Sequence, residues 1–177
     1  MSYTNEELEL FQRLYQESMA MVAETSHANI TKHSSFTQHI NCFIHSVKEL
    51  QIYQQSKLKE AVITRPALIM DIDLSYCTPT GETNAQRLAK GLAPYDAVTG
   101  SVIDLHHIGQ RYDSPFAELP HSVHNAPGIS SLLHHVKAPS WRHDHELTKQ
   151  YLKETSEYWR MRGAEDIQLE LRFSEQI

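Results

Sequence analysis

The strongest constraint on this chain is a pair of adjacent histidines, His106 and His107, at the end of a short apolar run. Residues 101–103 favour a strand, and neighbouring side chains on a strand point to opposite faces of the sheet. Both imidazoles therefore serve one site only if the strand ends at the pair and the backbone turns there. Gly109 and the polar residues after it supply the expected turn.

Histidine is also the outlier of the composition. The chain has 12 histidines in 177 residues, and eight of them fall between His106 and His145. Such clustering favours a metal site, and an adjacent pair suits metal-assisted hydrolysis because one imidazole can hold a cation while the other deprotonates a water. The chemistry-bearing residues follow the order strand, His-His, long loop, His, short apolar segment, His. This is the order of a ββα-metal site, in which a hairpin presents the base and one ligand and a following helix presents the other ligands.

The remaining composition is that of an ordinary globular protein, with 40% hydrophobic residues. The net charge of −6 gives no overall basic footprint for nucleic acid, although the second half of the chain is richer in cations and is compatible with a local basic surface. Cys42 and Cys77 form no CxxC motif, which argues against a Cys-ligated zinc finger and a disulfide framework. No signal peptide or membrane-spanning run is visible. We expect a soluble protein of a reducing compartment, without a membrane partner.

Two packing helices are predicted in the first third of the chain. Residues 4–7 form a capping box, and apolar residues at helical spacing predict a helix from about residue 5 to 24. A second apolar face predicts another helix from about residue 35 as far as Leu58. An Arg-Pro step ends this pattern, so we divide the chain into a helical extension of unknown role, residues 1–65, and a second domain, residues 66–177. We expect the extension to be dispensable for chemistry, because every candidate catalytic residue follows it.

The second domain alternates short strands, turns and helices, which together give an α+β, mostly helical fold class. The predicted elements are an extended segment at 67–74, a turn at 79–81, a capped helix from Thr83 that Gly91 ends, a hairpin turn at 97–100, a short apolar segment at 129–133 that delivers His134 and His135, and a last helix that begins at Asp144 and ends at Gly163.

Asp104-Leu105-His106-His107 resembles the acidic-Leu-His-His signature of the HNH/endonuclease VII nuclease superfamily, in particular its LHH subgroup, found as toxin domains at the C-termini of bacterial polymorphic toxins. The likeness covers about residues 70–163 and includes further matching segments: residues 91–96, 108–110, 115–119, His124, Leu133-His134, Ser140 and 158–162. Colicin-type DNases of the same superfamily share the signature and two later histidine ligands. The resemblance implies a ββα-metal (His-Me finger) nuclease core, here with an N-terminal helical extension.

Carried over position by position, the resemblance implies that His106, His124 and His134 are metal ligands and that His107 is the general base. Asp104 would orient or polarise one of the adjacent pair from outside the coordination sphere. Three neutral imidazoles with an open position also suit Zn²⁺ or a similar first-row cation. We therefore expect a divalent metal ion as cofactor, either Zn²⁺ or one of Mg²⁺, Mn²⁺ and Ni²⁺.

The sequence departs from the family at several points. The superfamily's central Asn has no clear counterpart, since Asn125 lies beside a proposed ligand, and His121 and Glu118 are the candidates for its place. The interval between the last two ligands is longer than in colicins, which makes His121 and His135 alternative ligands. The Cys-bound structural zinc of some relatives is absent. The candidates for phosphate contact are Arg111, Arg142 and Lys149.

These observations lead to a metal-dependent endonuclease with DNA as the favoured substrate, acting as a bacterial toxin effector that an immunity protein restrains. The alternatives are an RNase toxin, a phage or defence nuclease of the same fold and, from a different class, a non-catalytic His-rich metal-binding module. A structural site saturates its metal with four protein ligands, whereas a catalytic site keeps one position open. We expect the protein in the bacterial cytoplasm, or delivered by a specialised secretion system into the cytoplasm of a target cell.

Overall fold

A small four-stranded sheet lies at the centre of the structure. The computed structural model describes residues 25–134 and 143–174, with side chains as far as residue 166, and the isolated positions 13, 17 and 20. The strands are β1 (Lys59–Val62), β2 (Pro66–Ile69), β3 (Ile103–His107) and β4 (Phe116–Pro120). Their spatial order is β1-β2-β4-β3; β2 and β4 are parallel and the two outer pairs are antiparallel. The expected combination of helices with a small sheet is confirmed.

Short helices cover one face of this sheet, which we call the α4 face. They are α2 (His27–His33), α3 (Gln38–Asn41), α4 (Val47–Gln55) and α7 (Ile129–Leu133). Leu50 of α4 and Leu133 of α7 form one apolar core with Leu68 of β2 and Leu119 of β4. Residues from before and after the predicted domain boundary therefore share a single core.

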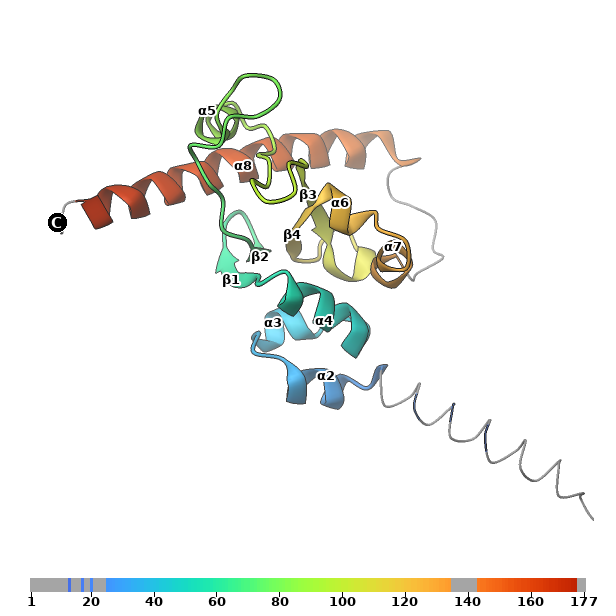
Figure 1. Cartoon of the computed structure of the whole chain (residues 1–177). Helices are drawn as coiled ribbons and strands as arrows, with labels where there is room; N and C mark the ends of the chain where they lie inside the picture. The colour runs from blue at the N-terminus through green and yellow to red at the C-terminus, as the bar shows by residue number, and fades with distance from the viewer. Residues whose placement is uncertain (1–12, 14–16, 18–19, 21–24, 135–142, 175–177) are drawn as a thin grey trace, which may run out of the picture.

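Two helices cover the opposite face, which we call the α8 face. They are α5 (Asn84–Ala89) and the long α8 (His145–Ser174), which crosses the whole molecule in Figure 1. Tyr158 and Trp159 of α8 pack there with Leu88 of α5 and Phe116 of β4. The helix end predicted at Gly163 is wrong. A side chain at this position would place its Cβ 2.7 Å from that of Leu88, so the glycine permits close packing of α5 against α8.

Strand β3 is buried on both faces, and its side chains alternate between them. Ile103 and Leu105 belong to the core of the α8 face, and His107 follows them at the same two-residue spacing. Asp104 and His106 consequently point to the α4 face. The adjacent histidines are thus divided between the two sides of the sheet.

The backbone turns directly after β3, as the sequence predicted. The 3₁₀ turn η1 (Ile108–Gln110) contains Gly109 with φ 75° and Gln110 with φ 59°. A Cβ at Gly109 would stand 2.9 Å from the carbonyl oxygen of Phe43, in the turn between α3 and α4. Glycine therefore allows both the left-handed backbone and the close contact between this loop and the N-terminal helices.

Several local predictions in the second half of the chain are confirmed. A capping box at Thr83 opens α5, and the Asp144 side chain accepts the first backbone N–H groups of α8. The apolar segment before His134 is helical. No helix in the described part of the chain combines the length and apolar character needed to cross a bilayer.

Predictions in the first third fare less well. The helix expected from residue 35 to Leu58 is interrupted, because residues 42–46 are not helical and the Ser46 side chain caps α4 by accepting the N–H of Glu49. Strand β1 was not predicted at all. The helix expected over residues 5–24 lies almost entirely outside the described residues.

The boundary placed after residue 65 lies in the short turn that joins β1 to β2, and these two strands are paired. We therefore predict that a chain beginning at Ala67 does not fold, contrary to the expectation that residues 1–65 are dispensable. It would lose β1 and expose Leu68, Leu119 and Leu133, each contributing about 2 kcal/mol of burial energy. Thermal unfolding followed by circular dichroism measures this. A chain beginning at Thr25 is the control and should unfold cooperatively; a cooperative transition in the shorter chain would contradict the prediction.

Glu49 of α4 makes stability depend on pH. Burial raises the pKa of its carboxyl from 4.5 to about 7, despite hydrogen bonds of 2.7 Å from the His45 N–H and the Tyr53 hydroxyl. A group that binds its proton more tightly in the folded chain stabilises the fold at low pH and loses that contribution as pH rises through its folded pKa. Between pH 4.5 and about pH 8, wild-type stability should fall by on the order of 3 kcal/mol more than that of Glu49→Gln. Denaturant titrations across this range measure the difference, and parallel pH profiles would contradict it.

Candidate metal centre and its surroundings

Three histidines from three segments converge on the α4 face, and we call them the histidine cluster. His106 comes from β3, His124 from the end of α6 (His121–His124) and His134 from the C-cap of α7. Their ring centroids lie 5.0 to 5.2 Å apart, and one ligand nitrogen of each lies within 4.8 Å of the others. The structure therefore brings together the three residues that the sequence analysis proposed as metal ligands.

The spacing of two of these nitrogens fits a single cation. His124 Nε2 lies 3.2 Å from His106 Nδ1. Two imidazole nitrogens bound to one tetrahedral Zn²⁺ stand roughly 3.3 Å apart, given Zn–N bonds of about 2.0–2.1 Å. Imidazole is also a ligand that Zn²⁺, Ni²⁺ and other first-row cations accept. The residues present thus fit the divalent cation that the sequence led us to expect.

Hydrogen bonds fix the outward nitrogen of two rings in the cluster. His124 Nδ1 lies 2.9 Å from Asp104 Oδ2, and His134 Nδ1 lies 3.0 Å from the carbonyl oxygen of Ser130. Because both partners are acceptors, Nδ1 carries the ring proton and Nε2 is the acceptor nitrogen in each case. Contacts of this kind hold the orientation of metal-binding imidazoles.

Asp104 serves two imidazoles at once. Its Oδ2 accepts hydrogen bonds of 2.9 Å from Nδ1 of His124 and from Nδ1 of His121. Partial burial acts to raise the pKa of Asp104, but the hydrogen bonds from the two rings outweigh it and hold that pKa below its usual value. The sequence led us to expect a contact with His106 or His107. The carboxylate instead orients two other histidines. His124 belongs to the cluster, and His121 lies at the edge of the cluster with a side chain that is 58% exposed.

His107 lies on the α8 face, across the strand from the histidine cluster. Its side chain is buried, and its ring centroid lies 4.8 Å from that of Phe116, 5.3 Å from that of Tyr151 and 6.4 Å from that of Tyr112. We call these three aromatic residues the His107 cage. The turn at Gly109 begins too late to bring both adjacent imidazoles to one face, so the strand's alternation decides where each ring lies.

Glu118, a candidate for the place of the superfamily's Asn, also lies on the α8 face. Its fully buried carboxylate accepts hydrogen bonds from the Tyr158 hydroxyl at 2.8 Å, Arg162 Nε at 3.1 Å and the Met70 N–H at 2.9 Å. Burial raises the pKa of Glu118, while the charge of Arg162 and these hydrogen bonds oppose the rise. Glu118 therefore ties α8 to β2 and β4, on the opposite side of the sheet from the histidine cluster.

Two of the three candidates for phosphate contact, Arg111 and Lys149, fall within the described residues. Arg111 is exposed and binds Asp113 through two hydrogen bonds of 3.0 and 2.7 Å. Lys149 is exposed near the start of α8. Arg142 and the alternative ligand His135 fall outside the described residues. Phosphate contact by Arg111 and Lys149 stays a prediction.

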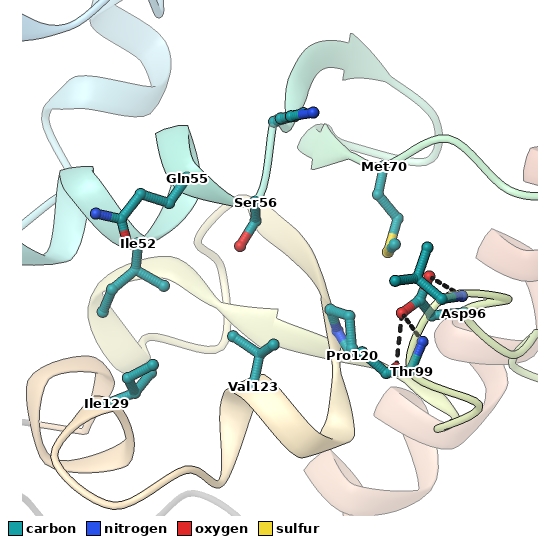
Figure 2. Close-up of a pocket in the computed structure, with 11 residues that line it drawn as sticks. Ile52, Gln55, Ser56, Met70, Asp96, Thr99, Pro120, Val123 and Ile129 are labelled. Carbon is teal, nitrogen blue, oxygen red and sulfur yellow. Dashed lines mark hydrogen bonds between the residues drawn. The ribbon is translucent and has the colours of Figure 1, made fainter.

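A cavity of about 500 Å³ lies between α4 and the α6–α7 segment, as Figure 2 shows. Ile52, Val123 and Ile129 contribute apolar surface to it. Asp96 lies at its edge and accepts hydrogen bonds from the backbone and hydroxyl of Thr99, so its carboxylate caps its own turn. The cavity offers mainly apolar contacts, and its lining differs in chemistry from the histidine cluster.

A known family matches the part of the chain that carries the histidine cluster. Residues 83–165 match a family described as a nuclease of the HNH/ENDO VII superfamily with conserved LHH. The matched range contains Leu105-His106-His107 and all three residues of the cluster. Over this segment the chain is similar to LHH nucleases. The match implies an enzyme that hydrolyses phosphodiester bonds, with nucleic acid as its substrate class. No solved structure matches the chain.

Sequence reasoning missed the surroundings of the second histidine of the LHH motif. Phe116 stands opposite His107 in the register of β3 and β4, and that pairing is not visible before the strands are aligned. Tyr151, which follows His107 by 44 residues in the sequence, packs against the same imidazole ring from α8. Arg65 belongs to the Arg-Pro step that ends the second predicted helix, and no further role was predicted for it. In the structure it contacts two members of the His107 cage.

We predict that Asp104→Asn weakens cation binding by the LHH segment about 10- to 100-fold, because His124 and His121 lose the charged acceptor that orients them. Titration calorimetry with Zn²⁺ measures the affinity, and His106→Ala gives the background from the other histidines. Glu118→Gln is the matched control on the opposite face. It should lower the melting temperature, because Arg162 is left buried beside a neutral group, but leave Zn²⁺ affinity unchanged. Wild-type affinity in Asp104→Asn would refute the orienting role.

Proposed function

We propose that this protein is a metal-dependent endonuclease whose cation is held by His106, His124 and His134. The observation that carries the proposal is the convergence of these three imidazoles, from β3, α6 and α7, within the segment that matches the nuclease family. The 3.2 Å separation of His124 Nε2 and His106 Nδ1 supports binding to one shared ion. The ββα-metal arrangement is supported by the chain order, since the antiparallel strands β3 and β4 are followed by the helices that supply two of the ligands.

The donor set favours Zn²⁺, Ni²⁺ or Mn²⁺ over Mg²⁺, because imidazole nitrogens suit first-row transition cations and Mg²⁺ prefers oxygen ligands. The chemistry supplied by a cation bound there is stabilisation of negative charge on the scissile phosphate and the leaving oxygen. A catalytic site keeps one coordination position open, whereas a structural site has four protein ligands, and the match to a nuclease family favours the catalytic form. The non-catalytic metal-binding module is therefore the less supported alternative.

In the proposed mechanism His107 accepts a proton from the attacking water, as the resemblance to HNH nucleases implies. Asp104 keeps the Nδ1–H tautomer of His124 and so presents its Nε2 toward His106. His121 is a second candidate for the proton acceptor. It is exposed beside the cluster and shares the Asp104 carboxylate with His124, whereas His107 lies across the strand.

We propose DNA as the favoured substrate. A water activated by an imidazole makes no demand on the sugar, whereas metal-independent ribonucleases use the 2′-hydroxyl of their substrate as the attacking group. Contacts to the phosphate backbone carry no direct sequence information, so we expect little base preference. RNA is the main alternative, because the net charge of −6 disfavours strong binding to a duplex.

The proposed biological role is that of a bacterial toxin effector, neutralised by an immunity protein and acting in the cytoplasm of a target cell. Its support is the resemblance of Leu105-His106-His107 and the flanking segments to the LHH domains of bacterial polymorphic toxins. A phage or defence nuclease would use the same site. Co-expression distinguishes these roles: a toxin should arrest growth of its host unless a cognate inhibitor is supplied.

Cleavage assays test the proposal directly. Purified protein should cut plasmid DNA when Zn²⁺, Ni²⁺ or Mn²⁺ is supplied, and a chelator should abolish the cleavage. His106→Ala should lose both metal affinity and activity, because a ligand is removed. His107→Ala should lower the rate at least 100-fold while metal still binds, since general-base catalysis contributes about 10²–10⁴-fold.

His121→Ala is compared with His107→Ala to assign the proton acceptor. Near-normal cleavage by His107→Ala together with an inactive His121→Ala would transfer the role to His121. RNA and DNA are offered in parallel under the same conditions. Cleavage of RNA alone, insensitive to chelator and leaving cyclic phosphate ends, would overturn both the substrate and the mechanism.

A further inference from the structure

The His107 cage is built from three parts of the chain. Phe116 begins β4, Tyr112 lies in the loop between η1 and β4, and Tyr151 lies in the first turns of α8. The ring of Phe116 meets that of His107 edge to face, at an interplanar angle of 73°. Since these residues come from separate elements, the contacts that hold the three elements together also hold the cage around His107.

Arg65, in the turn between β1 and β2, contacts two members of this cage. Its guanidinium carbon lies 4.6 Å from the ring centroid of Phe116 and 5.9 Å from that of Tyr112. Its Nη1 donates hydrogen bonds of 2.7 Å to the carbonyl oxygen of Tyr112 and 2.9 Å to that of Ser114. One guanidinium thus fixes both the loop that carries Tyr112 and the ring of Phe116.

The same guanidinium is bound to α8. Arg65 Nε donates to Glu154 Oε1 at 2.8 Å, and Nη2 donates to the same oxygen. Glu154 lies three residues after Tyr151, so the two side chains lie on the same side of the helix. Arg65 therefore reaches the third part of the cage through Glu154. Its side chain is only 17% exposed, which makes these contacts poorly accessible to competing water.

We propose that Arg65 is a positioning residue for His107: it clasps the loop at Tyr112, the ring of Phe116 and the start of α8 into one cage around the imidazole. This proposal rests on the function proposed above, in that His107 must act in catalysis for the clasp to affect the rate. Arg65 itself does not contact the ring of His107 in any described interaction. It acts through Phe116, Tyr112 and Glu154.

The planar guanidinium group explains why position 65 is an arginine. It can stack on an aromatic ring while its N–H groups bind a carboxylate and two carbonyl oxygens in different directions. A lysine has one compact ammonium group and cannot make all of these contacts together. Loss of the clasp should loosen the cage, and a displacement of about 1 Å in a reacting group can reduce a rate about 100-fold.

Arg87 provides a matched control. It is 14% exposed, forms an ion pair with Glu82, donates a 2.8 Å hydrogen bond to the Ala93 carbonyl and lies 5.0 Å from the ring centroid of Tyr95. Arg65 and Arg87 thus have similar burial and the same kinds of partner, but the partners of Arg87 surround α5. Arg65→Gln and Arg87→Gln should lower the melting temperature to a comparable degree.

The experiment compares both variants, together with Arg65→Lys and Glu154→Gln, in the full chain. The readouts are Zn²⁺ affinity, kcat and KM for plasmid DNA, and the NMR signal of the His107 ring, assigned by its loss in His107→Gln. We expect Arg65→Gln to shift or broaden the His107 signal and to lower kcat about 10- to 100-fold, with KM and Zn²⁺ affinity unchanged. Arg65→Lys and Glu154→Gln should show smaller effects in the same direction, and Arg87→Gln none.

An unchanged His107 signal in both Arg65→Gln and Glu154→Gln would overturn the proposal, as would an equal loss of kcat in Arg87→Gln. If Arg65→Gln fails to fold, Glu154→Gln still tests the proposal, because it removes only the contact between Arg65 and α8. If the wild-type protein cleaves neither DNA nor RNA, the proposed function fails. The His107 signal then decides the role of Arg65 by itself, because it reports the cage whether or not the protein is active.

Discussion

The two-residue period of β3 is the constraint on which the rest of the site depends. Because this strand is buried on both faces, every second side chain must be accommodated by a different layer of helices. His106 meets α6 and α7, where two further imidazoles complete a cluster suited to a cation. His107 meets aromatic residues under α8. The two histidines of the LHH motif therefore have different packing environments, on opposite faces of the sheet.

Buried and partly buried polar groups connect these layers to the sheet. Glu118 and Arg162 join α8 to β2 and β4, Arg65 joins α8 to the loop before β4, and Asp104 joins β3 to α6. Buried ion pairs contribute little net stability compared with apolar residues of similar size, but removing one partner is costly. Such pairs also permit few alternative arrangements, since each donor needs its acceptor. Of these contacts, the one from Asp104 holds the imidazole of His124, on the four-residue helix α6, beside His106.

The parts of the structure that sequence could predict are those fixed by local chemistry. The capping box at Thr83, the cap at Asp144 and the turn at Gly109 each depend on neighbouring residues, and each is present. The three cluster histidines were found by family resemblance. The misses depend on distant contacts in two ways. Gly163 was predicted to end a helix, but it lies within α8 and lets α5 pack closely against it. The role of Arg65 becomes visible only when β4 and α8 are placed beside it. Contacts between residues fifty or more positions apart produce no periodic pattern that a single sequence could reveal.

The position of α8 at the end of the described chain also sets an order of assembly. The three residues of the histidine cluster all lie at or before His134, so they leave the ribosome before α8 does. The α8 face stays open until α8 has been made, and its apolar surface around Phe116 and Leu88 remains exposed to solvent meanwhile. Contacts between residues far apart in sequence form slowly because a long loop must close first. A newly made chain would thus contain the whole histidine cluster before the surroundings of His107 exist. Under the proposed function, the metal site would be complete before His107 is positioned for catalysis.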